Sequence, residues 1–342
     1  MLPILRIAVL LALIPLCAAC NWVSLATNSL TYHTMQPGEA GNLVAVDSFV
    51  YATRGSNGLA IIDSRSGTEL GSVAPPSGSE SIDDIAIDGA LLFVLDAVPP
   101  GYVSVFSLVD PLRPALVSAP QPAPVGPFSG VSGTHGVTMI SGGTSQLTVW
   151  GYGLDGQIRG PIGTSDLGRG QPEILLAPNG VAFVSTHYWG PYFGLETIRF
   201  DSASRAVVRL GSLKLDGAGF TTGGAKPANF PIDLAMRGND TLLVAYARGV
   251  ALVNVSDPSS PELLRTIDVG GPAVNVDVDG IWAAVTVAGS NPAVVMIDLS
   301  PPAGPRIKRI PLPAGTNPAG VVFSGARVAV AARARGVLLL DR

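Results

Sequence analysis

A short strand-and-turn phrase occurs five times along this chain of 342 residues. Each copy is an apolar, β-branched run that stops at a polar turn, which is typical of a short β-strand. The copies are GLAIIDSRSG from Gly58, YVSVFSLVDPLRP from Tyr102, GVALVNVSDPSSP from Gly249, AVVMIDLSPPAGP from Ala293 and the C-terminal GVLLLDR. A chain that repeats this phrase is expected to fold as many short strands.

The spacing of the phrase predicts how these strands are grouped. Equivalent strand ends lie 43 to 53 residues apart, at Asp63, Ser107, Gly151, Asp201, Asn254, Asp298 and Asp341. The fifth unit divides into four strands, at Asp233–Met236, Thr241–Tyr246, Val250–Val255 and Leu263–Val269. A period in the forties with four strands per unit is typical of a β-propeller. The sequence predicts an all-β fold, a single seven-bladed β-propeller of four-stranded antiparallel blades, with six or eight blades as alternatives.

Turn dipeptides support this division. The innermost hairpin of a unit contains Asp88-Gly89, Asn179-Gly180, Asp279-Gly280 or Ser324-Gly325. Asp-Gly and Asn-Gly pairs supply the positive φ angles that two-residue hairpin turns need. We therefore expect a tight turn after each of these inner strands.

The last unit, Pro318 to Arg342, has length for only three strands. An open strand edge would remain unless another segment paired with it. Leu30–Met35 is the nearest strand-like segment to the start of the first unit. We expect it to close the last blade, so that residues 29–342 form the propeller.

Composition agrees with an all-β protein and excludes one class of partner. Hydrophobic residues make up 47% of the chain, and 41 Gly and 29 Pro interrupt the apolar runs. The formal net charge is −4, and no basic stripe is present. Nucleic acid is not expected as a partner, because phosphate contacts need clustered Lys and Arg. No G-x-S-x-G, H-E-x-x-H or P-loop phrase occurs.

The N-terminus has the pattern of an export signal. Arg6 precedes an apolar run from Ile7 to Ala19, which is short for a membrane span. The run ends in Ala18-Ala19-Cys20 and resembles a bacterial lipobox, although Cys17 stands where that motif prefers an aliphatic residue. The resemblance implies a signal peptide at 1–19, an acylated Cys20 and a tether at 20–28. A cleaved signal without lipid and an uncleaved anchor are the alternatives.

Two further resemblances concern the repeats. Val109–Pro114 and Ser256–Pro261 resemble the LVIVD-repeat proteins, which are mostly bacterial surface or periplasmic propellers. Blade four is also similar to the YVTN-type propellers that are related to lactonases. The first resemblance implies a β-propeller at the bacterial surface or in the periplasm. The lipobox resemblance adds the lipid anchor, and Asn21 after Cys20 favours sorting to the periplasmic or surface face of the outer membrane. The LVIVD resemblance brings no catalytic motif.

The loops that join second to third strands supply one set of candidate site residues. One such loop carries a dense aromatic cluster, made of His187, Tyr188, Trp189, Tyr192 and Phe193. Exposed rings would form a lip for a sugar, a peptide or a partner protein. The alternative is that the rings fold down and plug the channel mouth. Arg54 and Arg248 lie on equivalent loops and would suit an anionic ligand, or they are isolated solvated charges.

Aligned inner strands supply the second set. Asp84, Asp233 and Asn275 fall at equivalent positions, where Leu43 and Gly320 stand in the first and last blades. Oxygen ligands converging from several blades would hold Ca²⁺ or another hard cation. The alternative is that these groups hydrogen-bond between blades and to water.

Function follows less directly than fold. The first hypothesis is a non-enzymatic binding or scaffold module of the envelope, with an envelope protein or a glycan as partner and no cofactor apart from Ca²⁺. The second is a lactonase-like or other hydrolase that uses metal-binding oxygens at the channel rim. The third is a structural member of a larger envelope complex.

Overall fold

The computed structural model describes residues 40–98, 100–122, 128–134, 136–142, 146–166, 170–187, 193–215, 233–300 and 304–342. These residues form 27 strands and no helix, so the expected all-β class is confirmed. They belong to one compact unit, residues 31–342. No helix among them has the length and apolar character needed to cross a membrane.

The strands form six antiparallel sheets of four strands and one of three. We call the four-stranded sheets blades one to six, in chain order. The first strands are β1 (Leu43–Val46), β5 (Asp84–Asp88), β9 (Phe128–Thr134), β13 (Gly170–Leu176), β17 (Leu234–Arg237) and β21 (Ala273–Asp279). The second strands are β2 (Phe49–Thr53), β6 (Leu91–Asp96), β10 (Val137–Gly142), β14 (Val181–His187), β18 (Thr241–Tyr246) and β22 (Trp282–Val287).

The outer half of each blade completes the set. The third strands are β3 (Leu59–Asp63), β7 (Tyr102–Ser107), β11 (Gln146–Tyr152), β15 (Phe193–Asp201), β19 (Gly249–Asn254) and β23 (Ala293–Asp298). The fourth strands are β4 (Thr68–Val73), β8 (Ala115–Pro122), β12 (Ile158–Asp166), β16 (Ala206–Leu215), β20 (Glu262–Ile267) and β24 (Arg306–Pro311). The three-stranded sheet contains β25 (Gly320–Ser324), β26 (Arg327–Ala331) and β27 (Val337–Asp341).

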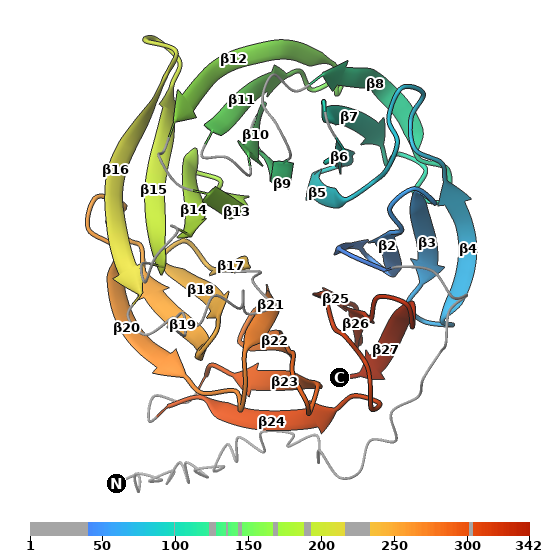
Figure 1. The fold of residues 1–342 in the computed structure, drawn as a ribbon, viewed down its shortest axis with the longest axis vertical. Helices are drawn as coiled ribbons and strands as arrows, with labels where there is room; N and C mark the ends of the chain where they lie inside the picture. Colours follow the sequence, from blue (N-terminus) through green and yellow to red (C-terminus); the bar gives the residue numbers. More distant parts are fainter. Residues whose placement is uncertain are drawn as a thin grey trace, which may run out of the picture. The chain divides into compact units, whose positions relative to one another are not determined.

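The sheets are arranged as a closed ring (Figure 1). Each first strand contacts the first strand of the next sheet, and β25 contacts β1 in turn. The fold is therefore a β-propeller with six four-stranded blades. The prediction of seven four-stranded blades differs from this result, because the seventh sheet has three strands among the described residues. The expected closing strand, Leu30–Met35, lies outside the described residues.

The inner hairpins have the predicted turn geometry. Gly89, Gly180, Gly280 and Gly325 have φ angles of 56°, 77°, 60° and 59°. Blade one uses Asp47 at the same place, with a φ of 53°. Aspartate tolerates this left-handed region better than most residues that carry a Cβ.

Antiparallel order places all connections on two sides of the ring. The turns from first to second strands and from third to fourth strands lie on one side, which we call the hairpin side. The loops from second to third strands and the links between sheets lie on the other, which we call the loop side. The loops predicted to carry the candidate residues are therefore on the loop side.

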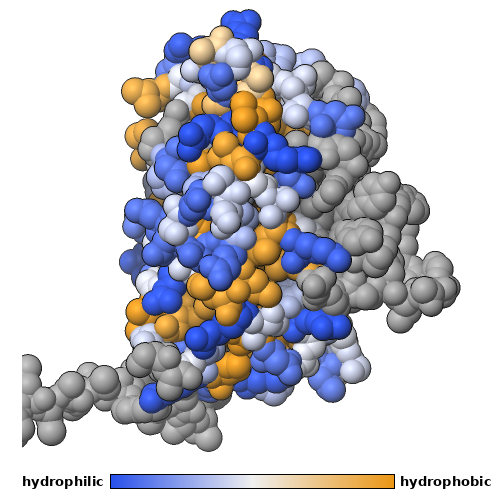
Figure 2. All heavy atoms as spheres, turned by 90° about the vertical axis from the view of Figure 1, so that its left-hand side faces the viewer, coloured by the Kyte–Doolittle hydropathy of each residue, from blue (hydrophilic) through white to orange (hydrophobic). Residues whose placement is uncertain are grey.

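The core lies between neighbouring sheets. Second and third strands are buried along nearly their whole length, whereas the outer strand β4 alternates between exposed and half-buried residues. Figure 2 shows the outer wall over β16 and β20, where hydrophobic residues lie in small groups between hydrophilic ones. The ring is thus held together by contacts between sheets.

Candidate functional site

A belt of polar side chains lies on the first strands, near the loop side. Strand pairing places seven residues at equivalent positions, each opposite the fifth residue of a second strand. They are Asn42, Asp84, Gly130, Glu173, Asp233, Asn275 and Gly320. We call this set the polar belt. Its members come from all six blades and the three-stranded sheet, with a glycine in blade three and in the three-stranded sheet.

Part of the belt is predicted correctly from the sequence. Asp84, Asp233 and Asn275 are equivalent, as expected. The assignment of Leu43 in blade one is wrong by one residue, because Asn42 holds that place and Leu43 points to the other face of its strand. Glu173 is missed altogether. Counting back four residues from the residue that bonds the start of the second strand, Val46 in blade one and Ala177 in blade four, would identify both.

Belt side chains bond the next sheet in the ring. The backbone N–H of Val131 donates to Asp84 Oδ2 at 2.7 Å, and that of Val276 donates to Asp233 Oδ2 at 2.8 Å. Val321 donates to the amide oxygen of Asn275 at 2.7 Å. The inner edge of a first strand has no further strand to pair with, so these side chains satisfy donors that would otherwise lack partners. We call each such bond a clasp.

A second row of clasps lies two residues further along the strands. The N–H of Leu176 donates to Ser132 Oγ at 3.0 Å, and the N–H of Phe323 donates to Asp277 Oδ2 at 2.7 Å. Both rows use a side chain of one sheet and the backbone of the next. The alternative proposed from the sequence, hydrogen bonding between blades, is therefore present at these positions.

Burial and mutual repulsion raise the pKa values of the carboxyl groups in the polar belt. Burial is the main cause that raises the pKa of Asp84 to about 6 and that of Asp233 to about 7. Burial, together with the charges of Asp84 and Asp233, raises the pKa of Glu173 well above its ordinary value. Clasps and the amide of Asn42, which donates to Asp84 Oδ1 at 2.5 Å, act in the opposite direction. Asp84 and Asp233 therefore change charge near neutral pH.

The belt gives limited support to a metal site. The described residues contain no group of three or more His, Cys, Asp or Glu side chains that could hold a metal ion. Asp84, Asp233 and Asn275 also use an oxygen each to accept a backbone N–H. The Ca²⁺ site at these residues stays a prediction.

The loop-side candidates are only partly described. His187 and Phe193 are paired at the loop-side ends of β14 and β15. Tyr188, Trp189 and Tyr192 lie outside the described residues, as does Cys20. Their expected roles stay predictions.

The two arginines have different surroundings. Arg54 forms a bidentate ion pair with Glu69 of its own blade, at 2.8 and 2.7 Å, which neutralises its charge. Arg248 is exposed in the turn between β18 and β19. Blades one and five are not neighbours in the ring, so the structure does not bring the two side chains together.

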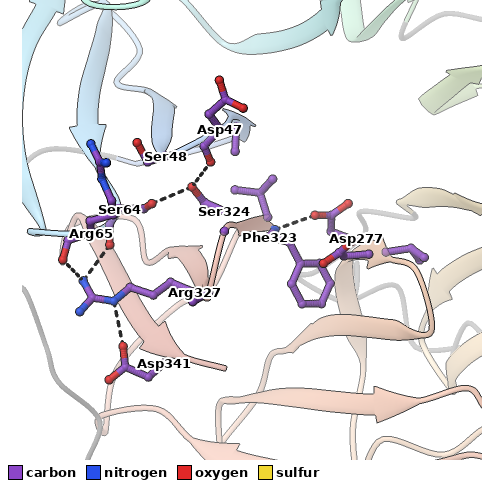
Figure 3. A pocket seen from close by; sticks show the side chains of 15 residues that line it. Asp47, Ser48, Ser64, Arg65, Asp277, Phe323, Ser324, Arg327 and Asp341 are labelled. Carbon is purple, nitrogen blue, oxygen red and sulfur yellow. Dashed lines mark hydrogen bonds and ion pairs between the residues drawn. The ribbon is translucent and has the colours of Figure 1, made fainter.

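A cavity of about 940 Å³ lies on the hairpin side, where the three-stranded sheet meets blade one (Figure 3). Ser324 Oγ lies 2.8 Å from Ser64 Oγ and 3.0 Å from the carbonyl oxygen of Asp47. Arg327 donates to the carbonyl oxygens of Ser64 and Arg65 and to the carboxylate of Asp341. These groups join the first and last sheets. Sequence patterns give no sign of them, because the partners are more than 250 residues apart.

Comparison with known proteins shows the fold alone. No family model matches the sequence, and no curated protein matches it. A structure titled U3-55K shares 12% identity at a TM-score of 0.63, covering 91% of this chain and 98% of its own. The WD40 repeats of RRP9 share 12% identity at a TM-score of 0.62, covering 91% and 96%. A computationally designed protein, Ika8, shares 12% identity at 0.57, covering 89% and 83%. The chain is similar to these propellers in architecture.

Proposed function

We propose that the protein is a non-enzymatic binding or scaffold module of the bacterial cell envelope, anchored through a lipid on Cys20. In this proposal the loop side receives an envelope protein or a glycan. The WD40-like neighbours support a binding or scaffold role in general terms. The lipobox resemblance and the LVIVD-like repeats support the envelope location.

One observation carries the choice of the loop side. The links between successive blades vary from the three residues 167–169 to the 18 residues 216–233, whereas inner hairpin turns have two to four. Loops that vary in length on a rigid scaffold are where binding surfaces are usually built. The clasps and the buried second and third strands supply that scaffold here.

A photo-crosslinking residue on each side of one blade tests this proposal in cells. Arg248 is exposed on the loop side of blade five, and Asn239 is exposed in its inner hairpin turn on the opposite side. We expect a discrete crosslinked product in the envelope fraction from position 248 and none from position 239. Equal products from both positions, or none from either, would contradict loop-side binding. The Cys20→Ala variant tests the anchor separately, because it should leave the membrane fraction.

The proposal includes a seventh four-stranded blade, completed by Leu30–Met35. Val337, Leu338, Leu339 and Leu340 of β27 are 1 to 3% exposed, although β27 has one strand neighbour among the described residues. The link from Met35 to β1 would be residues 36–42, and these seven residues fall within the range of the other links between sheets.

Two truncations test the closing strand. A soluble chain that starts at Asn21 keeps Leu30–Met35, whereas a chain that starts at Gln36 lacks it. We expect the shorter chain to unfold at a clearly lower temperature, because its β27 edge and apolar side chains become exposed. Equal melting temperatures would rule out this strand as the closing element.

The hydrolase alternative has less support. It needs converging metal ligands, and the described residues that could supply them already take part in clasps. Calorimetry with Ca²⁺, Mg²⁺ and Zn²⁺ distinguishes the two functions. Heat of binding that disappears in Asp233→Ala would favour the metal-dependent enzyme.

A further inference from the structure

Exposed apolar side chains outside the strands lie mostly on the hairpin side of the ring. Among the described residues, five large apolar side chains are exposed outside the strands. Four of them stand in hairpin-side turns, at Val109, Leu112, Leu154 and Ile281. Leu154 is 100% and Val109 84% exposed, which are the two highest values, whereas Val98 on the loop side is 36% exposed.

The turns that carry these side chains are held by hydrogen bonds. In the turn after β7, the N–H of Leu112 donates to Asp110 Oδ1 at 3.0 Å, and Tyr51 Oη donates to the carbonyl of Pro111 at 2.8 Å. In the turn after β11, the N–H of Gly156 donates to the carbonyl of Gly153 at 2.8 Å. Fixed turns that project apolar groups into water indicate a surface that meets an apolar partner.

The chain path gives an independent reason to place a membrane on this side. Ala40 pairs with Arg333 in the loop between β26 and β27, so the chain enters blade one from the loop side. β27 runs from that loop to Asp341 on the hairpin side. A closing strand antiparallel to β27 therefore has to start at the hairpin side and end at the loop side.

The expected tether is short. Nine residues lie between Cys20 and Leu30, so ten Cα-to-Cα steps of roughly 3.5 Å each span at most about 35 Å. A lipid on Cys20 would then hold the start of the closing strand, and with it the hairpin side, close to the bilayer.

We propose that the hairpin side lies against a lipid bilayer and that Val109, Leu112, Leu154 and Ile281 enter its headgroup region. This inference rests on the lipid anchor of the proposed function and adds the orientation of the ring. The hairpin-side turns carry Asp47, Asp110, Asp155, Asp257 and Asp279, and among them also the cations Arg65, Arg113 and Arg205, so acidic groups outnumber basic ones there. Anionic lipids would repel the acidic groups, so the partner is a surface of zwitterionic headgroups. The loop side then faces away from the bilayer and stays open to its partner.

Site-directed fluorescence on the acylated full chain tests this orientation. The sequence has two cysteines, Cys17 in the expected signal peptide and Cys20 at the lipid site, so one introduced cysteine is the only free thiol of the acylated chain. An environment-sensitive dye is attached at Leu154→Cys or, as the matched loop-side control, at Arg248→Cys. Both proteins are reconstituted into phosphatidylcholine vesicles that contain nitroxide-labelled lipid.

We expect at least twofold stronger quenching at position 154 than at position 248. Equal quenching at both positions, or stronger quenching at 248, would overturn the orientation while leaving the anchor intact. Failure of the acylated protein to float with the vesicles would overturn the anchor and the orientation together. That failure is recognised when the acylated protein floats with the vesicles no more than the Cys20→Ala variant does.

A second variant separates apolar contact from tethering alone. Leu154→Asp should lower quenching of a dye at Ile281→Cys at least twofold, whereas Leu264→Asp on the outer strand β20 should leave it unchanged. Replacing part of the phosphatidylcholine with the anionic lipid phosphatidylglycerol should also lower the quenching at position 281. Two results would contradict the proposed bilayer contact of the hairpin side. One is quenching at position 281 that stays the same in Leu154→Asp, and the other is quenching that rises with phosphatidylglycerol.

Discussion

The interface between blades five and six and the seam between the three-stranded sheet and blade one are built from different side chains. Alanine supplies four of the fifteen buried residues in the first interface but six of the ten at the seam. Asp233 clasps blade five to blade six near the loop side. The seam has Gly320 at the equivalent position and uses Ser324 and Arg327 on the hairpin side instead.

This difference follows from what each interface joins. Blades five and six are adjacent in the chain, so their contact forms with little loss of chain entropy. The seam joins the two ends of the ring, and its residues meet only when all other sheets are in place. Small side chains allow the close approach at Gly320, where a Cβ would lie 3.1 Å from the carbonyl oxygen of Gly41. We infer that the seam is the place where the ring opens most easily.

The largest expected effect compares the same substitution in both interfaces. Leu243 is 0% exposed between blades five and six, and Leu339 is 2% exposed at the seam. Leu243→Ala should lower the free energy of unfolding by about 3–4 kcal/mol, and Leu339→Ala by about 2–3 kcal/mol, because alanine neighbours offer fewer contacts to lose. Denaturant unfolding at equilibrium measures both values.

The control is the slope of unfolding against denaturant concentration. An unchanged slope shows that both variants expose the same surface on unfolding, so the two free energies can be compared. A seam variant that costs more than the Leu243 variant would reverse the comparison and make the seam the stronger interface.

The seam also marks the limit of what the sequence predicts. Repeat spacing and Asp-Gly turns locate most strands, and in blade five the predicted second strand, Thr241–Tyr246, matches β18 residue for residue. Such patterns are local, because the residues of one repeat predict only the strands and hairpin turns within that repeat. The contact of Ser324 with Ser64 depends on ring closure, so no local pattern contains it.

The candidate site divides in the same way. The acidic residues Asp84 and Asp233 stand out in aligned repeats, so the sequence identifies them. Their acceptor role depends on the backbone of a neighbouring sheet, which an aligned repeat does not show. Glu173 is missed because it lies six residues before the turn residue Asn179, whereas Asp84 lies four residues before Asp88, so aligning the turn dipeptides does not bring the two acids together.

A second, intermediate effect concerns the charged clasp that the seam lacks. The pKa of Asp233 is raised from 3.8 to about 7, so the native state holds its proton more tightly than the unfolded chain. Its stabilising contribution is present below about pH 4 and is lost as pH rises through about 7. The gain in stability that Asp233→Asn brings relative to wild type should therefore grow by about 2–3 kcal/mol between pH 5 and pH 8.

Asn275 shows why this substitution keeps the clasp. Its amide oxygen accepts the N–H of Val321 at the equivalent position, so an asparagine at 233 can accept the N–H of Val276 in the same way. Thermal melts between pH 5 and pH 8 measure the effect. Asp84, Glu173 and Asp277 also have raised pKa values, so the variant should reduce the pH dependence without removing it. A variant that is less stable than wild type at pH 8 would show that the charge itself strengthens the interface.

The smallest expected effect tests the seam directly. Ser324→Ala removes the hydroxyl that hydrogen-bonds Ser64 Oγ and the carbonyl oxygen of Asp47. The loss of these two hydrogen bonds should lower the free energy of unfolding by about 1 kcal/mol. If the seam is where the ring opens, hydrogen exchange should quicken roughly fivefold in β1 and β25 and remain unchanged in β18 and β19. Ser300→Ala, which removes an exposed hydroxyl bonded to Asp298 of its own turn, is the matched control and should alter neither region. Faster exchange spread evenly over all sheets would mean that the ring opens as a whole, and the distinction between the two interfaces would not hold.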